Sequence, residues 1–182
     1  MTLSASAIVI MGISGSGKST LGHCLSEATG YRFVEGDDLH PSANVAKMSA
    51  GTALTDEDRW PWLERVAAVL KEAPDASGAG RIVSCSALRR SYRDLLRSRV
   101  GDRLLFVFPQ VSIDVVQTRL RNRADHYMPP SLLDSQVATL ELPTPDEGVL
   151  MIDGEAGAAR SVDLILGFLS IPNDIQTRAA PR

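Results

Sequence analysis

Short apolar runs alternate along this chain with longer stretches in which apolar residues recur at helical spacing. The apolar runs are rich in β-branched or aromatic residues and are mostly continuous, as in strands that are covered on both faces. The predicted strands cover 6–11, 31–35, 81–85, 103–108 and 148–153. The predicted helices begin after Lys18 and cover 55–72, 87–99, 112–123, 130–140 and 156–169.

This alternation predicts an α/β fold, in which a parallel sheet with right-handed crossovers carries helices on both faces. In the stretch 55–72, Leu63, Val66 and Leu70 fall on one helix face. Thr55 and Asp58 predict an N-terminal capping box, with Asp in place of the usual Glu. The pattern contains no repeat and no sign of a second domain, so we expect one domain over 1–171 and a tail over 172–182.

Composition narrows the class of protein. The chain has 182 residues, of which 44% are hydrophobic, and a net charge of −3, so nothing indicates binding to nucleic acid or to an anionic membrane. The apolar runs are too short for a transmembrane helix. Cys24 and Cys85 show no CxxC spacing, which is typical of a reduced cytoplasmic protein.

The segment GISGSGKS at 12–19 matches the phosphate-loop pattern G-x-x-x-x-G-K-[ST], and it lies between a predicted strand and a predicted helix. Its glycines allow backbone N–H groups to point inward at an anion. Lys18 is expected to reach the β- and γ-phosphates, and the Ser19 hydroxyl is expected to bind Mg²⁺. The predicted nucleotide-binding residues are Gly12, Ser14, Gly15, Ser16, Gly17, Lys18, Ser19 and Thr20.

Two other phosphate-loop classes fit less well. A regulatory GTPase needs an NKxD segment after a late strand, whereas the nearest match, NRAD at 122–125, ends an arginine-rich helical stretch. An ATPase motor needs an acid that ends a central strand, and the run RIVSCSA has none.

Acids follow the second predicted strand instead, at the edge where open α/β sheets bind ligands. Asp37 is predicted to orient an acceptor hydroxyl and to take its proton, as in a small-molecule kinase. Glu35 is predicted to assist the metal, and Asp38 fits a cap or a solvated loop position.

Four segments carry a resemblance to a known family: GISGSGKST, EGDDLHPSANVAKMSAGTALTDEDRWPWL (35–63), CSALRRSYRDLLR (85–97) and RNRADHYMP (121–129). Together they resemble bacterial-type gluconate kinases, which are relatives of shikimate kinase in the nucleoside-monophosphate-kinase-like group. The resemblance extends to about Glu147. Two departures are small, because Glu35 stands where many members have Asp and Tyr127 stands where Phe is common.

The resemblance implies a three-layer P-loop kinase fold with strand order 2-3-1-4-5. It also implies phosphorylation of D-gluconate at its 6-hydroxyl, with ATP and Mg²⁺. Another sugar-acid or shikimate-type kinase, and a nucleotide-binding switch without an acceptor, stay as alternatives. The family is often dimeric, so a homodimer is open.

The resemblance also suggests residues for the acceptor. Arg59 stands where shikimate kinases use an arginine for their carboxylate, and a guanidinium suits a carboxylate through paired hydrogen bonds. Arg93 is expected either to bind substrate or to pair with Asp94 or Asp37. The other substrate candidates are His40, Lys47, Tyr92 and His126.

Residues 119–133 resemble the lid of this group, which closes over the nucleotide and keeps water from accepting the phosphoryl group. The lid carries arginine to neutralise charge that develops during transfer. Arg123 is the predicted catalytic arginine, in the pattern R-x-x-H-[FY]-M-P. Arg119 and Arg121 are weaker candidates, because a helix pair of arginines is often only solvated.

Overall fold

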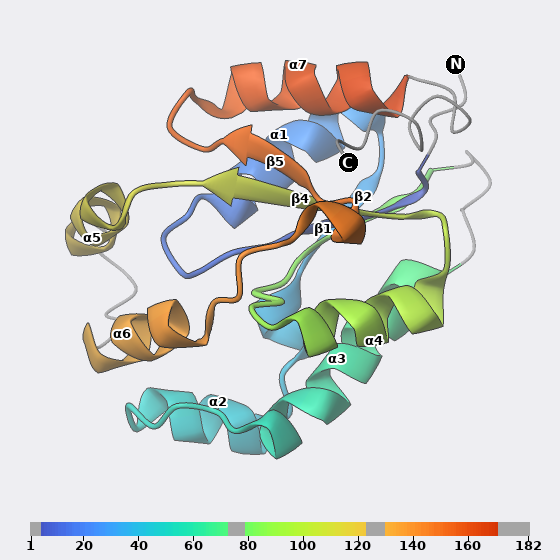
Figure 1. Ribbon diagram of the computed structural model, residues 1–182. Coiled ribbons are helices and arrows are strands. Elements are labelled where there is room, and N and C mark those ends of the chain that lie inside the picture. Colours follow the sequence, from blue (N-terminus) through green and yellow to red (C-terminus); the bar gives the residue numbers. More distant parts are fainter. Residues whose placement is uncertain (1–4, 73–78, 123–129, 171–182) are drawn as a thin grey trace.

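The computed structural model describes residues 5–72, 79–122 and 130–170, and its centre is a five-stranded sheet (Figure 1). All neighbouring strands are parallel, and their order β2-β3-β1-β4-β5 is the predicted one. The strands are β1 (Ala7–Ile10), β2 (Arg32–Glu35), β3 (Arg81–Ser84), β4 (Leu104–Gln110) and β5 (Leu150–Asp153). Strand β1 is central and fully buried, which explains its continuous apolar sequence.

The helices follow the predicted pattern with shifted ends. Their bounds are α1 (Lys18–Thr29), η1 (Gly36–Leu39), α2 (Ser42–Ser49), α3 (Asp56–Lys71), α4 (Arg90–Val100), α5 (Ile113–Arg121), α6 (Pro130–Thr139), η2 (Pro145–Glu147) and α7 (Ala158–Leu169). Helix α4 begins at Arg90, later than predicted, because Ala87 has a φ of 41°, outside the helical range. The periodicity gave no bounds for α2, whose side chains are mostly exposed.

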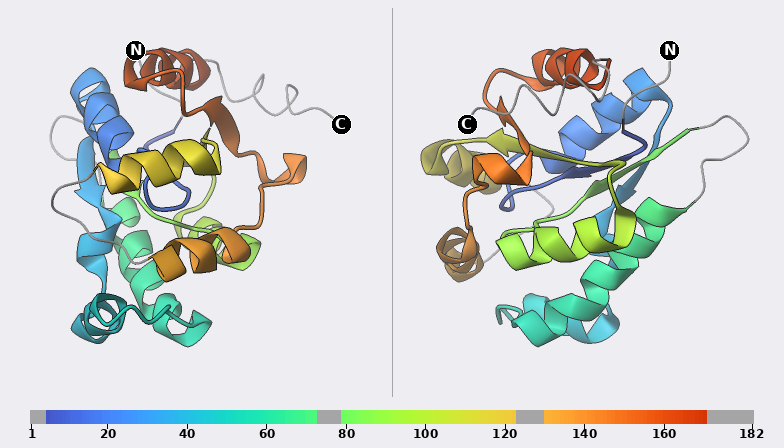
Figure 2. Two further views of the ribbon diagram at one scale, coloured as in Figure 1. Left: turned by 90° about the vertical axis from the view of Figure 1, so that its left-hand side faces the viewer. Right: turned by 45° about the vertical axis from the view of Figure 1, so that its right-hand side comes forward.

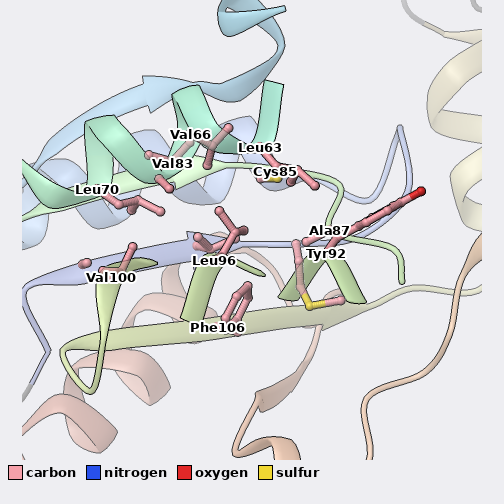
Figure 3. Close-up of a cluster of buried hydrophobic side chains, with 14 of the residues drawn as sticks. Leu63, Val66, Leu70, Val83, Cys85, Ala87, Tyr92, Leu96, Val100 and Phe106 are labelled. Carbon is pink, nitrogen blue, oxygen red and sulfur yellow. The ribbon is translucent and has the colours of Figure 1, made fainter. Parts of the chain in front are cut away.

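The sheet separates two apolar layers, with α1 and α7 on one face and α3 and α4 on the other (Figures 1 and 2). Alternate residues of β1 serve the two layers: Val9 belongs to the cluster beneath α3 and α4, and Ile8 to the cluster beneath α1 and α7. Leu63, Val66 and Leu70 of α3 pack in the first cluster, as their spacing predicted (Figure 3). Complete burial of such a side chain contributes about 1.5–3 kcal/mol.

The carboxyl ends of the strands meet at one edge of the sheet, which faces the viewer in the left view of Figure 2 together with α5 and α6. The connections that leave β1, β2 and β3 at this edge carry the phosphate loop, η1 and the segment 85–89. Open parallel sheets bind ligands at this edge, so the fold brings the predicted site residues to one place.

Some predictions concern residues outside the described ranges. The predicted tail over 172–182 is one, and the centre of the predicted lid, 123–129, is another. Within the described ranges, no helix is long and apolar enough to cross a membrane.

Candidate active site

The phosphate loop runs from the end of β1 to the first turn of α1, as predicted. Gly15 and Gly17 have φ values of 80° and 94°, which residues with side chains rarely adopt. A Cβ on Gly15 would also lie 3.0 Å from Cγ of Leu120, so both conformation and space favour glycine. Lys18 begins α1, and its Nζ donates to the carbonyl oxygen of Ile13 at 2.9 Å, so the ammonium lies over the loop.

Ser16 supports an anionic occupant for this loop. Its side chain is 3% exposed, and its Oγ is a buried polar atom that makes no hydrogen bond within the described part of the chain. Such a group is costly to bury without a partner, and that partner can be a water, an ion or a ligand. Ser16 lies between Gly15 and Gly17 and two residues before Lys18, so the loop fits a phosphate chain.

One cavity brings the phosphate loop together with the predicted acceptor residues. Ser14 and Lys18 line it from the loop, and Asp37, His40 and Arg59 line it from β2–η1 and α3. Its other lining residues are Met48, Ala53, Leu54, Ser86, Leu132, Ser135 and Gln136. A cation over the phosphate loop thus shares one cavity with a carboxylate and a guanidinium.

Gly36 fixes the chain just before Asp37. Its N–H donates to Ser84 Oγ at 3.0 Å, and its carbonyl accepts from Trp62 Nε1 at 2.7 Å. A Cβ at this position would lie 1.8 Å from the carbonyl oxygen of Ser84, so only glycine fits without moving β2 away from β3. Asp37 is therefore positioned by contacts with β3 and α3, which lie far away in the sequence.

His40 is a buried, neutral member of the cavity wall. It stacks on Trp62 with ring centroids 4.2 Å apart. Burial lowers the pKa of His40 to about 4; the charge of Asp37 opposes this shift, and the charges of Arg59 and Arg65 add to it. Asn44 Nδ2, which also donates to a backbone carbonyl, lies 3.3 Å from Nδ1, so Nδ1 accepts and Nε2 carries the proton.

Arg59 lies in the first turn of α3, whose capping box is confirmed. The Asp58 N–H donates to Thr55 Oγ1 at 3.4 Å, and the Thr55 N–H donates to Asp58 Oδ2 at 2.9 Å. Cζ of Arg59 lies 5.9 Å from the ring centroid of Tyr92, within range of a cation–π contact. The guanidinium is thus supported on one side while it lines the cavity.

Tyr92 supports this wall from behind and does not line the cavity. Its ring is fully buried, and its hydroxyl donates to Asp56 Oδ1 at 2.5 Å. Burial and this hydrogen bond raise the pKa of Tyr92 to about 12. Tyr92 thus contacts Asp56 and Arg59 in this structure, and its predicted contact with substrate stays a prediction.

Arg93 requires a correction. It pairs with Glu147, at 2.6 Å for Nε and 2.8 Å for Nη2, and the predicted pairing with Asp94 or Asp37 is wrong. Nη1 donates to the carbonyl oxygens of Ala87 and Leu88, so this fully buried guanidinium holds the segment that carries Ser86. The partner could not be predicted because Glu147 is 54 residues away.

Lys47 does not line the cavity either. Its Nζ donates to both carboxylate oxygens of Asp58, at 2.6 and 2.8 Å, on the exposed side of α2. This hydrogen bond is the main cause that lowers the pKa of Asp58. Lys47 is thus part of an ion pair with Asp58 in this structure, and its predicted contact with substrate stays a prediction.

The predicted metal residues lie after β1 and at the end of β2, two strands that lie on either side of β3 in the sheet. Ser19 is in the first turn of α1, and Glu35, at the end of β2, accepts a hydrogen bond from the Ser84 hydroxyl. The described residues contain no group of three or more His, Cys, Asp or Glu side chains that could hold a metal. Mg²⁺ is commonly bound by one or two protein oxygens together with substrate phosphates, so a binding mode through the Ser19 hydroxyl does not need a cluster of protein carboxylates.

Arg119 lies on the other side of the phosphate loop. Its Nη1 donates to the Ser16 carbonyl at 3.3 Å, and its Nη2 donates to the Gly154 carbonyl at 3.2 Å. It lines a second cavity together with Gly17 and Thr20. Arg119 therefore contacts the loop directly. The predicted Arg123 and His126 lie outside the described residues.

Sequence reasoning missed several residues of the main cavity. Ser86 follows β3, and the rule that ligands bind at strand ends would have found it. Ser135 and Gln136 come from α6, and no local motif marks them. They reach the cavity only through the packing of α6.

The fold and the cavity define the class of protein: a P-loop kinase of the small-molecule type. The model of the shikimate kinase family matches residues 14–143. A gluconokinase of Gluconobacter oxydans (strain 621H) is 48% identical over 157 residues, which cover 85% of this chain and 86% of the relative. The thermosensitive gluconokinase of Escherichia coli (strain K12) is 39% identical over 145 residues, or 80% and 76% of the two chains.

A solved structure agrees with these relatives. The crystal structure of a gluconokinase from Sinorhizobium meliloti 1021 superposes with a TM-score of 0.83 at 42% identity, covering 96% of this chain and 97% of that one. The chain belongs to the gluconokinase family, within the wider shikimate kinase group.

Proposed function

We propose that this protein transfers the γ-phosphoryl group of ATP to the 6-hydroxyl of D-gluconate, which yields ADP and 6-phospho-D-gluconate. The observation that carries the proposal is the shared cavity of Lys18, Asp37 and Arg59. A phosphate-binding cation, a proton acceptor and a carboxylate-binding guanidinium are the groups that this reaction needs. The names of the similar proteins supply the particular sugar acid.

The acceptor is held by side chains of the cavity wall. Arg59 binds the gluconate carboxylate through its two-pronged guanidinium, which matches the two carboxylate oxygens. His40 is neutral near pH 7, and its Nε2–H donates a hydrogen bond to a substrate hydroxyl. Together these groups hold the sugar acid by one end and along its chain, so that the distant 6-hydroxyl lies toward the phosphate loop.

Asp37 then acts on the reacting hydroxyl. It accepts the hydrogen bond of the 6-hydroxyl, orients the oxygen, and takes the proton as the new O–P bond forms and the bond to the β-phosphate oxygen breaks. Lys18 neutralises the negative charge of the transferring group and of the departing diphosphate. Transfer of this kind depends on position and charge more than on covalent help from the protein.

Ser19 would hold Mg²⁺, and Glu35 would assist it. When bound, the ion neutralises phosphate charge. Arg123 is proposed to add positive charge at the same point. The second cavity, with Arg119 and Thr20, lies beyond the loop on the side away from Asp37 and is suited to the remainder of the nucleotide.

A coupled assay of ADP formation tests this proposal. Purified protein is given Mg·ATP and, separately, D-gluconate, other sugar acids, shikimate and nucleoside monophosphates. We expect ADP release that depends on gluconate and exceeds the rates with the other acceptors. ADP release that no acceptor stimulates would favour a nucleotide-binding switch, and a preference for another acid would change the substrate.

A further inference from the structure

Gln136 makes a contact that neither the loop motif nor the proposed chemistry requires. Its side-chain oxygen Oε1 accepts a hydrogen bond from the backbone N–H of Ser14 at 2.7 Å, across 122 residues of sequence. Ser14 belongs to the phosphate loop, whose inward N–H groups serve to bind phosphate oxygens. A neutral carboxamide oxygen therefore stands where the loop is built to bind an anionic oxygen.

Packing holds Gln136 in this place. Leu133 lies one turn earlier on α6, on the same helix face, and it packs in an apolar cluster with Ile13 of the phosphate loop and Leu88. Just beyond α6, the N–H of Glu141 donates to the Leu88 carbonyl at 2.8 Å. The helix is thus fixed against the loop on one side of Gln136 and against the segment after β3 on the other.

The position of Gln136 indicates which phosphate of a bound nucleotide would use the Ser14 N–H. Gln136 lines the same cavity as Asp37 and Arg59, whereas the second cavity lies on the Arg119 side of the loop. The terminal phosphate must face the acceptor, so the oxygen that Gln136 displaces belongs to that phosphate and not to the inner two.

We infer that Gln136 is a substrate-site residue that occupies the place of a terminal-phosphate oxygen and competes with that phosphate for the Ser14 N–H. When the phosphate takes this N–H, the carboxamide turns into the cavity beside the acceptor. A carboxamide has both a donor and an acceptor, so it can bind a hydroxyl of the acceptor there. The inference rests on the proposed binding of a nucleoside triphosphate at the loop.

Binding without acceptor tests this competition. Dissociation constants are measured by calorimetry, with Mg²⁺, for ADP and for the β,γ-imido analogue of ATP. In Gln136→Met, which keeps the side-chain length but removes the oxygen, we expect the analogue to bind roughly two- to tenfold more tightly, the equivalent of one hydrogen bond. ADP affinity should not change, because ADP lacks the competing phosphate.

Gln136→Glu gives the opposite sign. Its carboxylate accepts more strongly from the Ser14 N–H and repels the terminal phosphate, so the analogue should bind about tenfold more weakly or worse, with a smaller effect on ADP. Val137→Ala, at the exposed neighbouring position of α6, is the matched control and should change neither constant. Gln136→Ala repeats the first comparison if the methionine variant does not fold.

Three outcomes would overturn the inference. Weaker analogue binding in Gln136→Met would make Gln136 a phosphate ligand, equal changes for ADP and the analogue would make it a structural contact, and no change would remove it from the site. Failure of the wild-type protein to bind the analogue would instead contradict the proposed function.

Discussion

The phosphate loop and the acceptor wall of the main cavity meet between Lys18 and Asp37, but they are built differently. The loop is a continuous segment that offers backbone N–H groups and one lysine, and its shape depends on glycines within that segment. The acceptor wall offers side chains from β2–η1, α3 and the segment after β3. Removing the lysine charge should therefore lower catalysis without affecting the rest of the fold. Binding of the acceptor, in contrast, should also depend on residues that do not touch the substrate.

Lys18→Ala should have the largest effect, and this effect should be confined to the function of the phosphate loop. We expect kcat to fall by about 10³-fold, because the cation that neutralises the transferring phosphate is lost. The fold should persist, since Lys18 is not part of either apolar layer. Turnover is measured by coupled ADP release and folding by circular dichroism; near-normal turnover in a folded variant would contradict the loop mechanism.

Glu147→Gln tests whether the acceptor wall depends on support from outside the cavity. Arg93 would lose its charged partner inside the core, and breaking a buried pair costs about 3–5 kcal/mol. Burial opposes ionisation of Glu147, but the hydrogen bond from Arg93 and other contacts bring its pKa down to about 2. The free energy of unfolding in urea should fall by that amount.

The control for this prediction is Glu64→Gln, which breaks the exposed pair between Glu64 and Arg99. Such pairs contribute only about 0–1 kcal/mol, so stability should hardly change.

In the Glu147 variant, the Michaelis constant for gluconate should rise more than that for ATP, because Arg93 holds the segment that carries Ser86. Equal losses for the two glutamates would contradict a supporting role for the buried pair.

Asp37→Asn removes the proton acceptor while keeping the size of the side chain. We expect kcat to fall about 10²-fold, at the low end for general-base help, because proton removal is late in a loose phosphoryl transition state. ATP binding should change little. Titration of Mg·ATP and gluconate with Asp37→Asn and with Glu35→Gln separates the two acids. The Mg²⁺ dependence of turnover should change only in Glu35→Gln. A wild-type rate in Asp37→Asn would contradict the role of Asp37 as base.

Arg59→Lys should distinguish the acceptor wall from the phosphate loop, because it should weaken only the binding of gluconate. Lysine keeps the charge but loses the two-pronged geometry, so we expect the Michaelis constant for gluconate to rise about tenfold, or about 1.4 kcal/mol. Initial-rate kinetics with each substrate varied in turn measure the effect. A larger loss of nucleotide affinity would move Arg59 out of the acceptor site.

His40→Asn should produce the smallest effect, on the pH dependence of stability. The folded pKa of about 4 lies below the unfolded value of 6.5, so the unfolded chain binds more protons between these values. Stability therefore rises with pH through this window and is lost as pH falls from 6.5 toward 4. If His40 were completely shielded from solvent, its pKa shift would change the free energy of unfolding by about 3 kcal/mol across this window. Because solvent screens the imidazole, we expect a change of about 1 kcal/mol.

The measurement is the free energy of unfolding in urea at pH 7, 6, 5 and 4. In His40→Asn, the free energy of unfolding should fall less steeply between pH 6.5 and pH 4 than in the wild-type protein, whatever the stability of the variant at pH 7. An identical slope in both proteins would show that His40 does not titrate as its surroundings indicate.

Much of the fold followed from local patterns. Apolar runs located all five strands to within a few residues, and the strand order came from the family resemblance. The loop motif located Lys18 because its geometry lies within one short segment. Asp37 and Arg59 entered as site candidates for different reasons, the first as an acid after a strand and the second by resemblance, and the fold brings both to the cavity.

The sequence by itself determined the layers of the fold, the phosphate loop and the acid that follows β2, because each depends on residues within a few positions of one another. Only the tertiary structure decided that Arg93 pairs with Glu147, that Tyr92 lies behind Arg59, and that Gln136 reaches the Ser14 N–H. These contacts join segments 33 to 122 residues apart. Periodicity records which face of a helix is apolar, but the partner of a polar side chain depends on how the elements pack.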